Sequence, residues 1–145
     1  MNYADFLQPQ EIEKAIVKVL IGISSQSKLL APVDTGLLRN SINWKTANQS
    51  GGLNDSATRG DVGGLGGQRA FTMIHELEAV TEPNTGVVGT AVEYAAAMEY
   101  GRQEVNIPAQ PYLRPAANMV KNRIPKIMGA EIRAAIKRMG KKDRK

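Results

Sequence analysis

The stretch PQEIEKAIVKVLIGISSQSKLL, residues 9–30, decides the fold of this 145-residue chain. Its apolar residues recur at steps of three and four, the spacing that puts them on one face of an α-helix. Pro9 suits the first turn of such a helix, because proline lacks the amide hydrogen that would stay unpaired there. Pro32 marks the end, since the residue before a proline avoids helical angles. We therefore predict an amphipathic helix over Pro9–Leu30.

A second apolar stripe predicts another long helix near the C-terminus. Pro115 opens this helix and Gly140 ends it. Pro125 should kink the helix or divide it in two, since an interior proline costs about 3 kcal/mol. The residues of the stripe are Ala116, Val120, Ile124, Ile127, Met128, Ile132, Ala135, Ile136 and Met139.

Between the two helices the sequence predicts a small antiparallel sheet. Ile42–Ala47, INWKTA, has the composition of a strand. Arg69–Thr81 and Gly86–Ala91 both look extended, and the EPNTG segment between them favours a turn. We therefore predict that these two segments form a β-hairpin.

Short helices and a connection complete the predicted order. Asp34 can cap a helical turn through residues 37–41. Val92–Tyr100 is predicted as a short helix, with Gly101 as its left-handed C-cap. Arg102–Tyr112 is predicted as an extended connection, because its prolines block a helix.

Residues 48–68 differ from the rest of the chain, because they hold seven of its fourteen glycines and show no apolar period. Glycine loses the most backbone entropy on ordering, so we expect a mobile loop unless a partner holds it. Candidate partner-ordered residues are Gly51, Arg59, Asp61 and Arg69. The whole chain then reads as a single α+β domain over residues 1–140, with this Gly-rich loop inserted and residues 141–145 as a basic tail. A small antiparallel sheet is packed by a long N-terminal helix and a long, Pro-kinked C-terminal helix.

The composition removes several kinds of chemistry. The chain has no cysteine, which excludes disulfides and thiolate metal sites and is typical of a protein assembled in a reducing cytoplasm. No apolar run approaches the roughly 20 residues that span a bilayer, and the N-terminus lacks the pattern of a secretory signal. The only histidine, His75, has no second histidine to share a metal or a proton, so we expect it to be structural or exposed.

Other motifs also fail to indicate catalysis. The sequence GDVGGLGGQR lacks the Gly-Lys-Ser/Thr end of a phosphate-binding loop. Asp55 and Asp61 do not have the spacing of a calcium loop, and no base accompanies Tyr94 or Tyr100. We therefore expect no enzyme, no metal and no cofactor.

Charge is distributed unevenly along the chain. From Arg114 onward there are eleven basic and two acidic side chains, whereas the preceding 113 residues carry eight basic and twelve acidic ones. Such a basic end either meets an anionic partner or is a solvated face with a frayed terminus. Its last basic residues are Lys137, Arg138, Lys141, Lys142, Arg144 and Lys145.

Two segments together resemble a known family. They are APVDTGLLRNSI, Ala31–Ile42, and VGTAVEYAAAMEYGRQEVNIPAQPYLRP, Val88–Pro115. In this order the pair is similar to the tail-completion family (head–tail connector, minor tail component) of lambdoid and related tailed phages. The first segment matches the family pattern at Pro32, Thr35, Gly36, Leu38 and Ser41. The second matches it at Tyr94, Ala95, Glu99, Tyr100, Gly101, Pro108, Ala109, Pro111, Tyr112, Leu113, Arg114, Pro115 and Ala116. The Gly-rich loop is a departure, because many relatives are shorter there.

The resemblance implies a virion structural protein without catalytic activity. Such proteins form a ring, expected to be hexameric, at the neck between the head connector and the tail. Implied partners are further copies of the chain, a tail terminator or tail tube protein, and a head-completion or connector protein. DNA would pass through the ring without sequence-specific binding, no membrane would be involved, and assembly would take place in the host cytoplasm.

The Pro-rich segment Arg102–Arg114 is the candidate for one face of the ring contact, because a preset extended segment loses little entropy on docking. The alternative is a structural connection tucked on its own domain. Candidate interface residues are Tyr94, Glu99, Tyr100, Arg102, Pro108, Pro111, Tyr112 and Arg114.

A second function remains open: a small basic nucleic-acid-binding protein that uses the C-terminal helix. Its basic residues could contact phosphates. Against this, the helix has no aromatic residues, and the chain has no helix-turn-helix or finger motif. A phage-encoded hydrolase is a third possibility, for which the chain offers no catalytic set.

Overall fold

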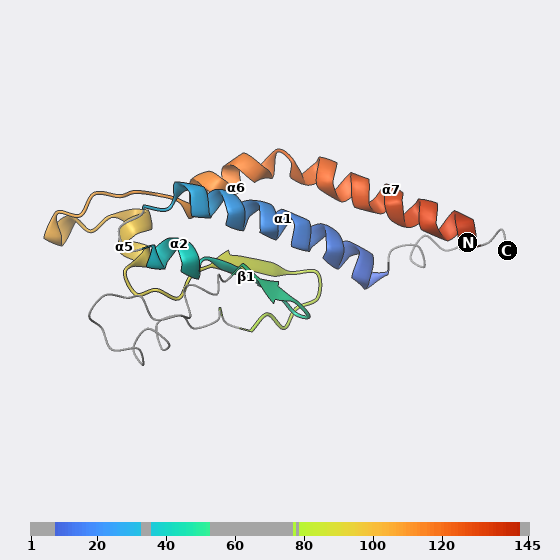
Figure 1. The fold of residues 1–145 in the computed structure, drawn as a ribbon, viewed down its shortest axis with the longest axis horizontal. Helices are drawn as coiled ribbons and strands as arrows, with labels where there is room; N and C mark the ends of the chain where they lie inside the picture. The colour runs from blue at the N-terminus through green and yellow to red at the C-terminus, as the bar shows by residue number, and fades with distance from the viewer. Residues whose placement is uncertain (1–7, 33–35, 53–76, 78, 143–145) are drawn as a thin grey trace.

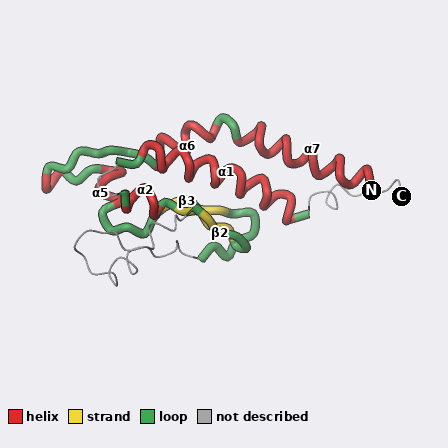
Figure 2. Tube along the Cα trace, in the orientation of Figure 1, coloured by secondary structure: helices red, strands yellow, loops and turns green. Residues whose placement is uncertain are grey.

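The computed structural model describes residues 8–32, 36–52, 77 and 79–142, which form an α+β fold (Figures 1 and 2). The predicted fold class is confirmed. In chain order, the elements are α1 (Pro9–Leu30), α2 (Leu37–Ser41), β1 (Asn43–Thr46), β2 (Ser50–Gly51), β3 (Gly86–Gly89), α5 (Ala95–Tyr100), the 3₁₀ turn η2 (Gln103–Val105), α6 (Leu113–Lys121) and α7 (Ile124–Lys142).

Helix α1 is the central element, and its predicted bounds are confirmed. It packs against α6 and α7 on one side and against the sheet on the other (Figure 1). Small residues make the close approach possible: a Cβ added to Gly22 would lie 3.6 Å from a methyl carbon of Val120 on α6. The buried Ser27 hydroxyl donates to the Ile23 carbonyl at 2.8 Å, so it is satisfied inside its own helix.

The C-terminal helix is divided near Pro125, as predicted, into α6 and α7. The predicted first and last residues of this helical segment are wrong. Helix α6 begins at Leu113 rather than Pro115, and α7 continues past Gly140 to Lys142. A glycine inside a helix costs only about 1 kcal/mol relative to alanine, so packing of α7 against α1 can outweigh it. Lys141 and Lys142 therefore belong to a helix rather than to a tail.

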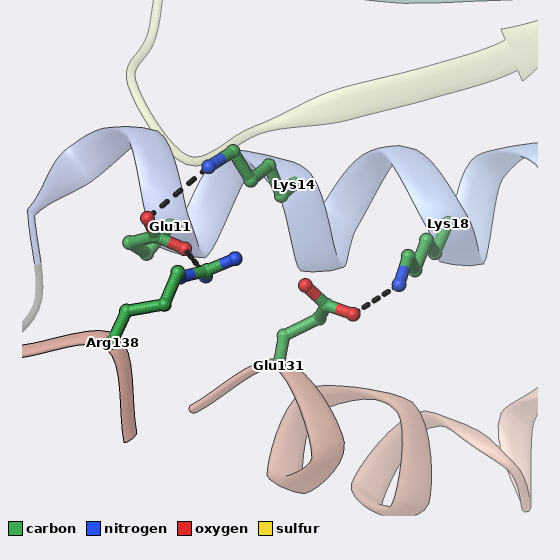
Figure 3. A network of polar contacts seen from close by, with 5 residues as sticks. All are labelled: Glu11, Lys14, Lys18, Glu131 and Arg138. Carbon is green, nitrogen blue, oxygen red and sulfur yellow. Dashed lines mark hydrogen bonds and ion pairs between the residues drawn. The ribbon is translucent and has the colours of Figure 1, made fainter. Parts of the chain in front are cut away.

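Ion pairs join α7 to α1 along this contact, and Figure 3 shows them from close by. Arg138 of α7 contacts Glu11 of α1 at 2.5 Å, and Glu131 of α7 contacts Lys18 of α1. Lys14 pairs with Glu11 at 3.1 Å within α1. The basic partners in these pairs are exposed, so each pair adds little stability. The two pairs between the helices follow their antiparallel arrangement, with the end of α7 beside the start of α1.

The sheet has the order β2-β1-β3 and is antiparallel. β1 lies within the predicted strand, but in the described residues nothing of the predicted partner of β3 is a strand. Residues 77 and 79–81, the described part of Arg69–Thr81, are not a strand, and β3 pairs with β1, with Trp44 opposite Val88. The remainder of that segment, including Arg69 and His75, lies outside the described residues, as do Asp34, Arg59 and Asp61.

The first residues of the predicted Gly-rich loop form a strand instead. The Thr46 hydroxyl accepts the backbone N–H of Gln49 at 3.0 Å, and the Thr46 N–H donates to the Gln49 carbonyl at 2.7 Å. This tight turn returns the chain as β2, with Gly51 opposite Trp44. Glycine is required there, because a Cβ would lie 2.8 Å from the Trp44 ring.

The two short helices are confirmed, but the cap of α2 and the start of α5 differ from the prediction. α2 covers the predicted residues 37–41, and its N-cap residue is Gly36, with φ +78°, rather than Asp34. α5 begins at Ala95, three residues after the predicted start at Val92. The buried side chains of both helices face one another in a cluster at the end of the molecule beside the C-terminal end of α1.

We predict opposite effects for alanine at two glycines. Gly51→Ala should lower the free energy of unfolding by about 1–3 kcal/mol, because its Cβ would overlap the buried Trp44 ring. A Cβ added to Gly140 would meet no atom within 4 Å, so Gly140→Ala should raise the free energy of unfolding by up to about 1 kcal/mol. Urea unfolding of both variants measures this. Equal stability of the two variants would contradict the close packing of β2 on Trp44.

Candidate subunit interface

The eight predicted interface residues gather at one end of the molecule, where α5, the following loop and the start of α6 meet (Figure 1). Because α6 begins at Leu113 with Tyr112 as its cap, we define the arm as residues 102–111. Six of the eight candidates are exposed: Tyr94, Tyr100, Arg102, Pro108, Pro111 and Arg114. The other two, Glu99 and Tyr112, are 7% and 0% exposed, so in this chain they contact their own domain.

Glu99 holds the start of α6. One carboxylate oxygen accepts the backbone N–H groups of Tyr112 at 2.8 Å and Leu113 at 2.9 Å. The other accepts the N–H of Arg114 at 2.9 Å. The first N–H groups of a helix have no partner inside the helix, and the helix dipole favours negative charge there. A residue of α5 thus caps α6 from across the arm.

The protonation state of Glu99 follows from this cap. Burial alone would raise the pKa of its carboxyl. The N–H groups of Tyr112, Leu113 and Arg114, together with the charge of Arg114, outweigh burial and hold the pKa below the ordinary 4.5. Glu99 is therefore ionised at neutral pH.

The arm folds back on itself, so its prediction as an extended connection is wrong. Arg102 and Ile107 exchange two backbone hydrogen bonds, at 2.8 and 3.0 Å, around the 3₁₀ turn Gln103–Val105. Asn106 closes the turn with φ +54°, a left-handed conformation that asparagine tolerates. In Figure 1 the arm projects past the C-terminal end of α1. All of its side chains except Ile107 are exposed, so it is not tucked on its own domain.

Two backbone bonds hold the base of the arm. The Gly101 N–H donates to the Ala97 carbonyl at 2.8 Å, and the Gln110 N–H donates to the Met98 carbonyl at 2.7 Å. The predicted positive φ of Gly101 is confirmed at +75°, but its ψ of 172° is extended rather than left-handed helical. A Cβ at Gly101 would lie 2.8 Å from the Ala109 nitrogen, so the two sides of the arm meet closely at this glycine.

An apolar cleft of about 550 Å³ opens beside the base of the arm. It lies between α1, β3, α5 and α6, and Tyr100 and Arg114 line it. Arg114 places its guanidinium 5.4 Å from the centre of the Tyr100 ring, a cation–π contact between two exposed side chains. Other lining residues are Leu20, Ile23, Val88, Ala96 and Ala117.

Tyr112 also lines the cleft. Its hydroxyl is buried without a hydrogen-bond partner among the described residues. Burial, followed by the nearby charge of Glu99, raises the pKa of Tyr112 to about 12. The phenol is neutral at physiological pH.

The predicted basic residues of the C-terminal end divide between two faces of α7. Arg138 pairs with Glu11 on the α1 side, while Lys137 and Lys141 are exposed. Lys126 and Arg133, which the prediction missed, are also exposed. Lys126, Arg133, Lys137 and Lys141 follow one another at steps of seven, four and four residues and so share one helical face. That helical spacing was the available signal. Arg144 and Lys145 lie outside the described residues, and of the four loop candidates only Gly51 is described.

Comparison with known proteins finds no matching family model, no matching curated protein and no matching solved structure. Within the described ranges, no group of His, Asp and Glu side chains could hold a metal ion. The described helices include none that is long and apolar enough to cross a membrane.

We predict a pH-dependent role for Glu99. Glu99→Gln should lower the free energy of unfolding by about 1–3 kcal/mol at neutral pH, because the amide cannot accept all three N–H bonds. A lowered folded-state pKa gives stability that is complete above pH 4.5 and is lost as the pH falls through the folded pKa. The difference between wild type and variant should therefore narrow below pH 4.5.

The matched control is Glu93→Gln, which makes the same chemical change at an exposed glutamate. It should shift stability by less than about 0.5 kcal/mol. Thermal unfolding across the acidic range measures both variants. A constant gap between Glu99→Gln and wild type at all pH values would contradict the cap.

Proposed function

We propose that the chain is a virion structural protein, a subunit of a ring, expected to be hexameric, at the head–tail neck of a tailed phage. The ring would complete the tail and join it to the head connector. The observation that carries this proposal is that the two segments of family resemblance, Ala31–Ile42 and Val88–Pro115, pack together into one core.

The buried apolar cluster at the arm end of the molecule comes entirely from these two segments. Ala31, Leu38 and Ile42 come from the first, and Val92, Ala95 and Tyr112 come from the second. The hydroxyls of Ser41 and Thr90 join the segments further, at 2.6 Å. If the resemblance were accidental, the two matching segments would not be expected to pack against each other in the fold. The contact therefore supports the resemblance as a whole rather than as two separate motifs.

The surface features fit a ring subunit. A ring needs a heterologous contact, in which one face of a subunit meets a different face of the next. The arm supplies a projecting and internally hydrogen-bonded element for such a contact. Further partners under this proposal are a tail terminator or tail tube protein and a head-completion or connector protein. DNA would pass through the bore without sequence-specific binding, and the chain would catalyse no reaction.

The test is removal of the gene from the phage that encodes the chain. The expected result is separate DNA-filled heads and tails, which a wild-type copy supplied in trans restores to joined particles. Electron microscopy counts the joined fraction, and mass spectrometry detects the chain in purified particles. Joined and infectious particles that lack the chain would contradict the proposal.

One observation favours the second candidate, a nucleic-acid-binding protein. Lys126, Arg133, Lys137 and Lys141 form an outward basic stripe on α7, and none of them pairs with a carboxylate in the described part of the chain. The stripe extends for about 22 Å at ~1.5 Å per residue, long enough to meet several phosphates. In a neck ring, a strong grip on DNA would slow its passage. We therefore place the stripe against an acidic face of a neighbouring protein.

Neutralising the end of the stripe separates the two functions. Under the neck proposal, the double variant Lys137→Gln, Lys141→Gln should weaken joining of the ring to its neighbour. Its affinity for DNA should equal that of a control double variant. The control is Arg39→Gln, Lys121→Gln, which removes two exposed charges elsewhere. Joining by the wild type should itself weaken as salt is raised. A fall in DNA affinity specific to the α7 variant, with a salt slope reduced by about 2, would favour nucleic-acid binding instead.

A further inference from the structure

The tip of the arm presents an apolar side chain to solvent. Val105 is 55% exposed at the end of η2, and Glu104 beside it has a side chain that is 82% exposed. The hydrogen bonds between Arg102 and Ile107 fix the loop before any partner is met. A preordered loop loses little conformational entropy on docking, so even one apolar side chain and one charge at its tip can contribute to binding.

The cleft at the base of the arm offers the complementary surface. Its lining combines aliphatic side chains, such as Leu20, Ile23 and Val88, with the small residues Ala96 and Ala117. Thr90 and Arg114 also line the cleft, but its aliphatic part offers a valine apolar contacts. The cleft therefore suits the apolar tip by its chemistry.

The charges beside the two surfaces also match. Glu104 lies 3.6 Å from Arg102, and both side chains are largely exposed, so this pair adds little. Arg114 lines the cleft and lies over the Tyr100 ring, and its guanidinium forms no ion pair with a described carboxylate. A carboxylate that enters beside the cleft would thus lie near a guanidinium that already acts on Glu99 and Tyr100 but has no ion pair among the described residues. Glu104 is adjacent to Val105 in the chain, so an inserted tip would bring both side chains to the cleft.

We propose that the arm of one copy docks in the cleft of the next copy, with Val105 in the cleft and Glu104 paired with Arg114. This inference rests on the proposed ring function and names the contact that builds the ring. The arm cannot fill the cleft of its own chain in the observed conformation, because its base is held by the Gly101 and Gln110 bonds and it projects away from the body (Figure 1). Arm and cleft are different surfaces of one chain, so the contact is head-to-tail and can close into a ring.

The cysteine-free sequence allows a direct cross-linking test on the full chain. One preparation carries Val105→Cys and the other carries Ala96→Cys, an exposed residue of the cleft. Mixed under mild oxidation, they should form a disulfide-linked one-to-one heterodimer. The matched control replaces Ala96→Cys by Lys137→Cys, an exposed position on the outer face of α7, and should give no such product.

Three results would contradict the proposed contact between arm and cleft. One is the absence of the heterodimer. Another is a Val105→Cys homodimer that forms as readily, since it would indicate a symmetric contact between tips. A third is a cleft cysteine that a thiol reagent cannot reach in the separate chain, since the chain itself would then fill the cleft.

A second variant separates this inference from the neck function. Val105→Asp should abolish the cross-linkable contact and the joining of heads to tails, and leave the melting temperature of the separate chain unchanged, because Val105 is exposed. Val105→Ile should preserve joining. If joining requires the chain but tolerates Val105→Asp, the neck function stands and the arm contact fails. If joining does not require the chain at all, the neck function fails.

Discussion

The arm end of the molecule depends on one interaction, the capping of α6 by the carboxylate of Glu99. This carboxylate accepts hydrogen bonds from three backbone N–H groups at the start of α6, and so holds the end of α5 beside the start of α6. With both ends of the arm held, the loop between them projects without a hydrophobic anchor of its own. A buried ionised acid is costly unless its hydrogen bonds are complete, and here they are. The same cap directs α6 along α1, so one residue couples the local shape of the arm to the packing of the long helices.

The long helices then set a second constraint, which is the close approach of α1 to its neighbours. Gly22 faces Val120, and three of the five buried residues of α1, Ala15, Ser24 and Ser27, are small, so small side chains contribute to the contact beside Val19 and Leu20. Little aromatic bulk is needed in such a core. The sheet places Trp44 where β2 presents Gly51.

What could be predicted from the sequence was what local periodicity and proline determine. The bounds of α1 and the division near Pro125 follow from patterns within a few turns of helix. The pairing of β3 with β1 was not predicted, because the two strands lie some forty residues apart in the sequence and no local pattern identifies the partner. The role of Glu99 was missed for a similar reason: its partners lie 13 to 15 residues further along the chain. A single acid among the apolar residues of AAAMEYG was the available signal.

The uneven charge of the sequence acquires a spatial meaning in the fold. Part of the basic C-terminal end is used within the chain, where Arg138 pairs with Glu11. Glu131, the only described acid of α7, also turns toward α1, where it pairs with Lys18. The outward face therefore keeps Lys126, Arg133, Lys137 and Lys141 without any acid to offset them. The arm lies at the opposite end of the long axis from the end of α7 (Figure 1). One chain thus separates the exposed Val105 at the tip of the arm from the basic face of α7, and the proposed ring subunit would use these two surfaces for different neighbours.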